Sequence, residues 1–355
     1  MRRALVVALL LGVATPAAAQ TRAPKIELEV YGGLGRFLDA GSGTLSLPAA
    51  GAPITTSSPM APSRRVPSWF FGDGATLLND VAAQLDLAAR ITPLDAVIAG
   101  IGRTAENNTS MGARLRYRTA PKVWTELGVD VSASTTSVPD SLMASVDVSR
   151  ESFVATFSEL LASGPFTNRS VTATATQGGG SWREITTSLA ANIEFGSVAG
   201  LTPYATVGGG FVTRRGTEPS VSLTGRYAAR ILGSVPIDET DRVTVRGVAR
   251  NAPAIIIGAG LTRAIGSRLT FRLNARLVAA NRTIGANIDA SPSVATGSPA
   301  DYIESFTNPS IQFSNNTSTG RRSSLSGDAL DHLDVARSTR IQARGLVTVG
   351  FGFRF

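Results

Sequence analysis

The chain has 355 residues, no cysteine, one histidine and a formal net charge of +8 at pH 7. The lack of cysteine excludes disulfides, thiolate metal sites and a lipoprotein anchor. Nucleic acid is not an expected partner, because the Lys and Arg residues stand singly, often at alternate positions, and form no basic block.

The first residues have the order of a secretory signal peptide. Arg2 and Arg3 precede an apolar stretch over 4–14, and Pro16 and three alanines follow before Gln20. A charged start, a short apolar region and an A-x-A site predict cleavage after Ala19. The apolar stretch is too short for a membrane helix, which needs about 20 residues. We therefore expect a cleaved signal peptide over 1–19 and one domain over 20–355.

Eight segments alternate apolar and polar residues with the period of two that is typical of a strand with one apolar face. They are 26–37, 111–119, 122–132, 184–195, 201–214, 252–264, 268–279 and 341–355. The longest apolar run after the leader is 252–261. Its length suits a tilted membrane strand of about 9–11 residues and not a membrane helix.

The connections between these segments alternate in length without exception. Three are short, near 120–121, 196–200 and 265–267, and four are long, near 38–110, 133–183, 215–251 and 280–340. Short turns on one side and long loops on the other are typical of membrane barrels. In hydrocarbon every backbone polar group must be paired, which a closed sheet achieves. We predict an all-β fold, a closed antiparallel transmembrane β-barrel of about eight strands, in which 341–355 pairs with 26–37.

Two of the long loops contain short amphipathic helices. The first is expected to begin at Asp73 as its N-cap and to end before Pro93, and its apolar stripe is Leu77, Leu78, Val81, Leu85 and Ala88. The stripe of the second is Phe153, Val154, Phe157, Leu160 and Leu161, ahead of Gly164. We expect the helices to pack on each other or across the barrel mouth. A binding face for a partner or lipid is the alternative.

Other loop segments differ in composition. Segments 171–177 and 181–187 flank three glycines and predict a hairpin that continues the barrel wall, and 220–231 with 241–249 predicts a second one. The segment 41–68 has the composition of flexible coil. The polar loop over 281–340 is expected to be mobile.

Placing the polar faces inward brings charged residues into the barrel. They are Glu27, Glu29, Arg114, Arg116, Glu126, Asp130, Glu194, Arg272, Arg276 and Arg344. Opposite signs fall on neighbouring strands. An eight-stranded barrel is just wide enough for side chains to fill it, and an unpaired buried charge is strongly penalised. We predict a lumen plugged by salt bridges; a narrow or gated ion path is the alternative.

Motifs that suggest chemistry are weak. Residues 99–105 resemble a nucleotide-binding glycine turn but lack the following βαβ unit and the third glycine. The glycines at 208–210 also resemble a phosphate loop, but glycines in a barrel strand more often permit tight curvature or the close approach of a neighbour. His332, next to Asp331 and near Asp334, could serve a Ser/His hydrolase or acyltransferase with Ser323, Ser324 or Ser326. Activation needs a base held within hydrogen-bond reach, and this segment is expected to be mobile. We predict no enzyme, no cofactor and no metal site.

Together, the signal peptide, the amphipathic strands, the alternating loop lengths and the aromatic last strand resemble bacterial outer-membrane β-barrel proteins. The size suggests the small OmpA/OmpX type with enlarged extracellular loops, and those long loops leave ten strands open. The resemblance implies a Gram-negative outer-membrane location in the lipid bilayer. It also implies that Phe351, Phe353 and Phe355 form the signal read by the barrel-assembly machinery.

The expected function is a structural or surface-interaction role with an unknown extracellular ligand. A narrow porin or small-solute channel is the alternative, and an outer-leaflet lipid-modifying enzyme that depends on His332 comes third. The strands encode only the membrane environment, so neither the ligand nor the oligomeric state follows from the pattern.

Overall fold

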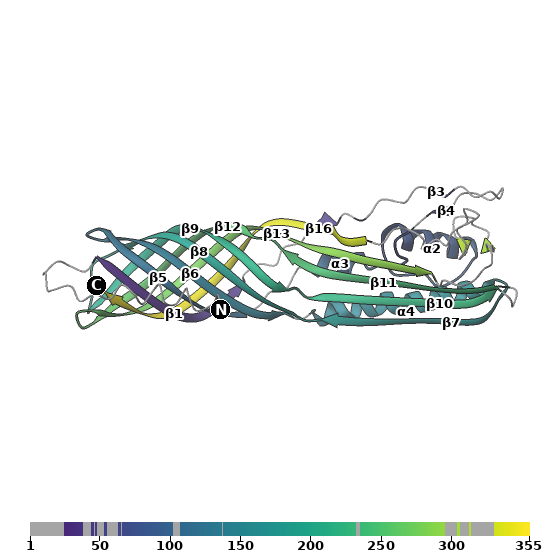
Figure 1. Cartoon of the computed structure of the whole chain (residues 1–355), viewed down its shortest axis with the longest axis horizontal. Helices are drawn as coiled ribbons and strands as arrows, with labels where there is room; N and C mark the ends of the chain where they lie inside the picture. The colour runs from purple at the N-terminus through teal and green to yellow at the C-terminus, as the bar shows by residue number, and fades with distance from the viewer. Residues whose placement is uncertain are drawn as a thin grey trace, which may run out of the picture.

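The computed structural model describes residues 25–37, 44–45, 47, 53–54, 63–64, 66–101, 107–136, 138–231, 235–294, 304–305, 312–313 and 330–355. The expected signal peptide, most of the segment 41–68 and the three serines near His332 lie outside these residues. The molecule is elongated, with a barrel at one end and a sheet accompanied by helices at the other (Figure 1).

Eight strands close the barrel in one antiparallel ring, so the alternative of ten is wrong. The strands are β1 (Ile26–Phe37), β5 (Asn107–Ala120), β6 (Val123–Thr136), β8 (Gly180–Glu194), β9 (Leu201–Thr217), β12 (Ala252–Ile265), β13 (Leu269–Val294) and β16 (Leu330–Arg354). They correspond one to one to the predicted segments. β16 pairs with β1 and with β13, and the Phe355 N–H donates to the Ile26 carbonyl at 3.0 Å. The predicted closure is confirmed.

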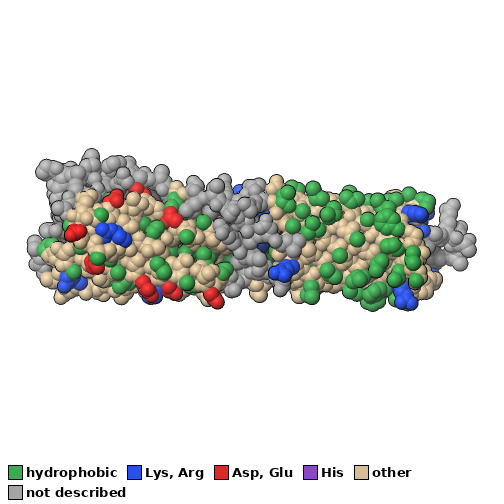
Figure 2. Space-filling model, turned by 180° about the vertical axis from the view of Figure 1, so that it is seen from behind, with side chains coloured by type: hydrophobic (Ala, Val, Ile, Leu, Met, Phe, Trp, Pro, Cys, Tyr) green, Lys and Arg blue, Asp and Glu red, His purple; other side chains and the backbone are tan. Residues whose placement is uncertain are grey.

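The outer face of the barrel is apolar, and the inner face is polar. On the last strand Val347, Val349, Phe351, Phe353 and Phe355 are all exposed, as their odd numbering predicts. Hydrophobic side chains cover the barrel half in Figure 2, whereas the other half carries Asp and Glu on its surface. An exposed apolar belt around a sheet without edges is the form that a hydrocarbon environment selects, because every backbone group is paired within the wall.

A second sheet extends from the barrel at the end where the long connections lie. β13 and β16 run on beyond the barrel and stay paired as far as Ala290 and Leu330. β11 (Val235–Ala249) joins β13, β10 (Ser220–Ile231) joins β11, and β7 (Phe166–Gly178) joins β10. We call these five strands the distal sheet. The shorter described strands are β2 (Thr44–Leu45), β3 (Pro53–Ile54), β4 (Ser63–Arg64), β14 (Glu304–Ser305) and β15 (Gln312–Phe313).

The distal sheet is packed against helices and forms with them what we call the distal domain. The helices are α2 (Gly72–Gln84), α3 (Asp95–Gly100) and α4 (Asp140–Ser163). None of the described helices combines the length and apolar character needed to cross a bilayer. The core of the domain contains Phe153, Phe157 and Tyr227, and the rings of Phe157 and Tyr227 stack with centroids 4.3 Å apart. The alternating pattern of the sheet puts apolar residues on this side and polar residues on the other.

The helices differ from the expectation in their ends and in their partners. Asp73 lies in the first turn of α2, Phe71 is the N-cap, and the helix ends at Gln84, so Ala88 is outside it. Four of the five stripe residues of α4 are buried and Val154 is partly buried, and the helix packs mainly on β7 and β10 of the distal sheet. The apolar face of α4 therefore neither covers the barrel mouth nor forms an exposed binding face. The distal sheet, which the sequence pattern did not predict, is its apolar partner.

Two loop predictions are wrong. β7 pairs with β10, and β8 pairs with β6 and β9, so residues 171–177 and 181–187 form no hairpin with each other. The partly buried Val171, Ala173 and Ala175 pack against the distal core, which holds β7 there. The described parts of 281–340 include the ends of β13 and β16, which are regular strand and not mobile loop. The second hairpin, β10 with β11, is confirmed.

Candidate functional site

The polar side chains of the barrel strands meet inside the barrel. Of the ten predicted charged residues, Glu27, Glu29, Arg114, Arg116, Glu126, Asp130, Arg272, Arg276 and Arg344 are buried. Glu194 also lies on the inward face of its strand, at the end of the barrel with the short turns. It is half-buried and makes no ion pair within the described residues. The strands thus bring together nine of the ten residues.

Glu27 is the centre of the cluster nearest the short turns. Arg116 Nη1 donates to its Oε1 at 3.0 Å, Arg272 Nη2 lies 2.7 Å from the same oxygen, and Arg354 Nε donates to Oε2 at 2.8 Å. Strand register explains two of these contacts, because Glu27 stands opposite Arg116 on β5 and opposite Arg354 on β16. Arg354 was on a predicted polar face but outside the predicted network.

Glu126 links opposite walls of the barrel. Arg276 donates to it twice, from Nη1 to Oε1 at 2.6 Å and from Nη2 to Oε2 at 2.9 Å, while Arg116 Nε donates to Oε2 at 2.8 Å. β6, which carries Glu126, and β13, which carries Arg276, stand four places apart in the ring of eight strands. A bidentate pair of this kind fixes both position and orientation. The contact therefore crosses the lumen.

A second cluster lies toward the distal domain. Arg344 Nη2 donates to Asp130 at 3.1 Å and Arg344 Nη1 lies 3.3 Å from Glu184 Oε1, while Arg282 Nη2 donates to Glu184 at 2.8 Å. Glu184 and Arg282 were not among the predicted residues. Glu184 had the inward parity of its strand, which was a usable signal, but Arg282 fell in a segment that was assigned to a loop.

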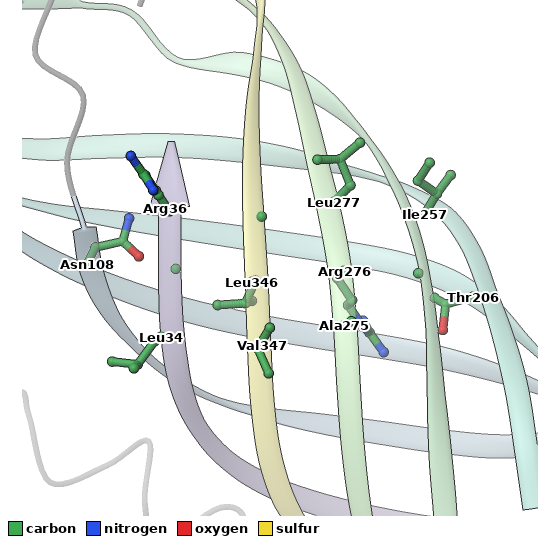
Figure 3. Close-up of a pocket in the computed structure, with 13 residues that line it drawn as sticks. Leu34, Arg36, Asn108, Thr206, Ile257, Ala275, Arg276, Leu277, Leu346 and Val347 are labelled. Atoms are coloured by element: carbon green, nitrogen blue, oxygen red, sulfur yellow. The ribbon is translucent and has the colours of Figure 1, made fainter. Parts of the chain in front are cut away.

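A hollow of about 980 Å³ lies in the barrel wall (Figure 3). Its lining includes the lipid-facing Leu34, Ile257 and Val347, which are exposed, together with the inward Asn108 and Arg276. An opening lined by the outer apolar belt suits a hydrocarbon chain better than a water-soluble substrate, because few polar groups converge on it.

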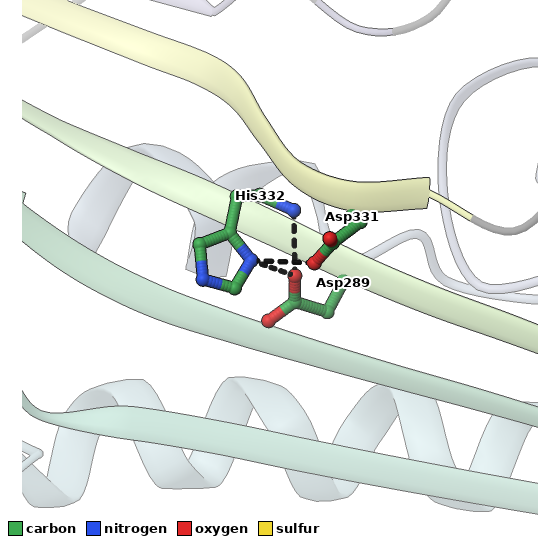
Figure 4. Close-up of side chains that lie close together, drawn as sticks. All are labelled: Asp289, Asp331 and His332. Carbon is green, nitrogen blue, oxygen red and sulfur yellow. Dashed lines mark hydrogen bonds and ion pairs between the residues drawn. The ribbon is translucent and has the colours of Figure 1, made fainter.

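His332, Asp289 and Asp331 form a cluster on the distal sheet (Figure 4). The register of β13 and β16 shifts between Ile288 and Ala290, opposite a His332 backbone with φ of 50°. The His332 N–H donates to Asp289 Oδ1 at 2.7 Å, and His332 Nδ1 lies 2.9 Å from the same oxygen and 2.7 Å from Asp331 Oδ1. The expectation that His332 lies in a mobile loop is wrong.

This cluster could hold a cation, since its ligand atoms lie within 4.8 Å of one another. However, the hydrogen bond with Asp289 raises the pKa of His332. A raised pKa favours the imidazolium form, which has no lone pair for a metal. The serines considered as nucleophiles lie outside the described residues.

Two more acids lie buried in the core of the distal domain. Asp241 Oδ2 accepts from the Trp69 N–H at 2.7 Å and from the Ser68 hydroxyl at 2.9 Å, and Tyr227 donates to Glu239. Burial raises the pKa of Asp241 to about 7. Asp241 and Glu239 lie on the same face of β11 as the buried Val243 and Val245. Because acidic side chains are normally exposed, the sequence did not predict that these two are buried.

Comparisons with known proteins find only distant structural similarity. No family model and no curated protein matches the chain. The outer membrane protein OprG from Pseudomonas aeruginosa is similar at 10% identity and a TM-score of 0.34, over 94% of this chain and 97% of its own. CarO and CarO2 from Acinetobacter baumannii are similar at 12% and 13% identity with TM-scores of 0.26, over 69% of this chain and 92% of theirs.

Likeness at these identities and TM-scores carries no function to this chain. The strand pairing and the apolar belt of the chain itself define its architecture. A closed ring of eight antiparallel strands with short turns at one end and long connections at the other is the design of bacterial outer-membrane proteins. By these features the chain has the architecture of an eight-stranded outer-membrane β-barrel, enlarged by its distal domain.

Proposed function

We propose that this protein is a membrane anchor that holds its distal domain rigidly outside the cell, with a lumen closed by its own side chains. The observation that carries the proposal is the continuity of β13 and β16, which run for 26 and 25 residues from the barrel into the distal sheet. Strands shared by two parts transmit orientation, whereas a linker would let the distal domain turn freely.

The closed lumen is supported by contacts between opposite walls. Glu126 and Arg276 meet across the barrel through two hydrogen bonds, and the Glu27 cluster lies nearer the short turns. An eight-stranded barrel is only wide enough for its side chains, and separating buried opposite charges to admit water and ions is costly. The barrel is therefore an anchor and not a channel.

The distal domain carries the interaction role and not an enzymatic one. Its outer sheet face is polar, with Thr240, Thr244 and Asp289 among its half-buried side chains, and an extracellular ligand is expected to bind there or on the loops. The aromatic last strand supports insertion by the barrel-assembly machinery. Residues at the ends of the short turns would then face the periplasm.

Single-channel recording on the purified protein in planar bilayers tests the closed lumen. We expect no stable conductance, and a Glu194→Gln control to behave in the same way, because Glu194 makes no ion pair within the described residues. A stable conductance in the nanosiemens class, an order-of-magnitude mark for the wide barrels that leave an aqueous channel, would contradict the proposal and favour a narrow channel.

Epitope tags test the orientation. A tag between β10 and β11 should be reached by antibody in intact cells, whereas a tag at Gly266, in the short turn between β12 and β13, should be reached only after the outer membrane is opened. The reverse pattern would refute an outward distal domain without affecting the closed lumen.

A further inference from the structure

A hollow lies where the barrel meets the distal sheet. It encloses about 560 Å³, within the range of roughly 300–1,000 Å³ that is usual for ligand pockets. Its lining comes from the end of β9 with the turn after it, the start of β10, and the facing parts of β11, β13 and β16. The lining residues that matter here are Arg215, Ser220, Arg246, Asn287 and Asp289. We call it the junction hollow.

Three exposed arginines that have no ion-pair partner among the described residues lie at the junction hollow. Arg215 and Arg246 line it, Arg183 stands directly opposite Arg215 on the neighbouring strand, and none of the three has an ion-pair partner in the described part of the chain. Like charges placed directly opposite each other destabilise a sheet. Other arginines nearby are paired, Arg214 with Glu218 at 2.7 Å and Arg250 with Asp334 at 2.6 Å. Arg183, Arg215 and Arg246 therefore provide positive charge that a bound anion would neutralise.

The height of these arginines matches the layer of lipid headgroups. On β9 the exposed apolar residues run from Leu201 to Phe211. Ten residues at about 3.3 Å each, tilted by about 40°, span roughly 25 Å, which is the height of the apolar band of such barrels. Arg215 lies four residues beyond Phe211, or about 10 Å further along the barrel axis by the same geometry. Its guanidinium, and that of Arg183 beside it, therefore reach the level of the headgroups.

We propose that the junction hollow binds the phosphorylated saccharide headgroup of an outer-leaflet glycolipid. Arg183 and Arg215 hold a phosphate through charge-assisted, bidentate hydrogen bonds, and Arg246 adds a third positive charge. Ser220, Asn287 and Asp289 offer hydroxyl, amide and carboxylate groups to sugar hydroxyls. The apolar wall below, toward Phe211, receives the acyl chains. This ligand lies outside the barrel and goes beyond the anchoring function, although it uses the same membrane orientation.

Native mass spectrometry of the mature protein in nanodiscs provides the test. The probes are purified lipid A, enzymatically dephosphorylated lipid A and inorganic phosphate. We expect lipid A to bind, and the double variant Arg183→Gln/Arg215→Gln to lose at least tenfold in occupancy. The matched control is Arg242→Gln/Arg263→Gln, which removes two exposed arginines away from the hollow and should bind as the wild type does. Arg246→Gln should show a smaller loss and serves if the double variant does not fold.

Three results would overturn the proposal that the junction hollow binds a glycolipid headgroup. Equal occupancy in the double variant and its control overturns the proposal, and so does equal binding of dephosphorylated lipid A. If millimolar inorganic phosphate binds with the same dependence on Arg183 and Arg215 and displaces lipid A completely, the ligand is a soluble phosphate and the lipid assignment is wrong. Heat-modifiable gel migration of each variant reports the barrel separately, so failure of the anchor would be seen apart from failure of the site.

Discussion

Asp241 offers the sharpest test of the distal domain. Its carboxyl group is fully buried, and the groups that act on it are the Trp69 N–H, the Ser68 hydroxyl and the neighbouring Glu239, none of which is a cation. Burial is the largest influence and raises its pKa from 3.8 to about 7. The folded domain therefore holds this proton more tightly than the unfolded chain does, and the Asp241→Asn variant removes the titration.

The sign and size of the effect follow by linkage. Because the folded pKa is raised, the contribution of Asp241 to stability is complete below about pH 4 and is lost as the pH rises toward about 7. A difference of about three pKa units corresponds to about 4 kcal/mol at 1.36 kcal/mol per unit. We expect the wild-type domain to lose stability of this order between acid and neutral pH. Asp241→Asn should lose much less and be the more stable of the two at about pH 8.

Trp69 provides the readout, because it lies in the distal core while Trp124 and Trp182 belong to barrel strands. The chain has three tryptophans, so the double variant Trp124→Phe/Trp182→Phe retains Trp69 alone. Urea unfolding followed by its fluorescence in detergent, at about pH 4, 6 and 8, gives the free energy of unfolding of the domain.

Asp238→Asn is the matched control on the same strand. Its hydrogen bond with Arg226 lowers the pKa of Asp238, so its small contribution has the opposite sign and is lost as the pH falls. A wild-type domain that gains stability from acid to neutral pH, or an Asp241→Asn domain as pH-dependent as the wild type, would refute the account of a buried, protonated carboxyl group.

Three further predictions concern packing and charge. Glu126→Gln leaves Arg116 and Arg276 buried without their shared carboxylate and should cost about 3–5 kcal/mol; a heat-modifiability assay should show a lower melting temperature than for Glu194→Gln, and equal melting would count against the network. Phe157→Ala removes a ring that contacts Trp69 and Tyr227 and should cost the distal domain about 3–5 kcal/mol. Limited proteolysis should then digest that domain and spare the barrel, unlike in the exposed control Val148→Ala; unchanged resistance would mean that the core tolerates the cavity. Gly33→Ala places a Cβ in a clash with the Val347 carbonyl oxygen, whereas a Cβ at Gly32 would lie 3.9 Å from its nearest neighbour, the Ser110 carbonyl oxygen. The folded fraction on a cold gel should fall for Gly33→Ala and not for Gly32→Ala, and equal fractions would show that the wall can shift.

The residue pattern alone determined the barrel. Lipid outside and a narrow polar lumen inside impose a strict period of two on every spanning strand, and this period can be read without knowing which strands are neighbours. The acidic face of β1 and the basic face of β5 therefore predicted contacts such as Glu27 with Arg116. The crossing pair of Glu126 and Arg276 lay among the predicted residues, but only the ring of strands placed them opposite each other.

Tertiary structure decided the distal domain. The alternation of β7 fits either β8 or β10, and the choice of β10 depends on the apolar core beneath the sheet. The polar segments that extend β13 and β16 read as loop because only one of their faces is buried, and their pairing supplies the missing regularity. Asp241 and the junction hollow arise the same way: each depends on segments far apart in the chain, whose proximity no local period encodes.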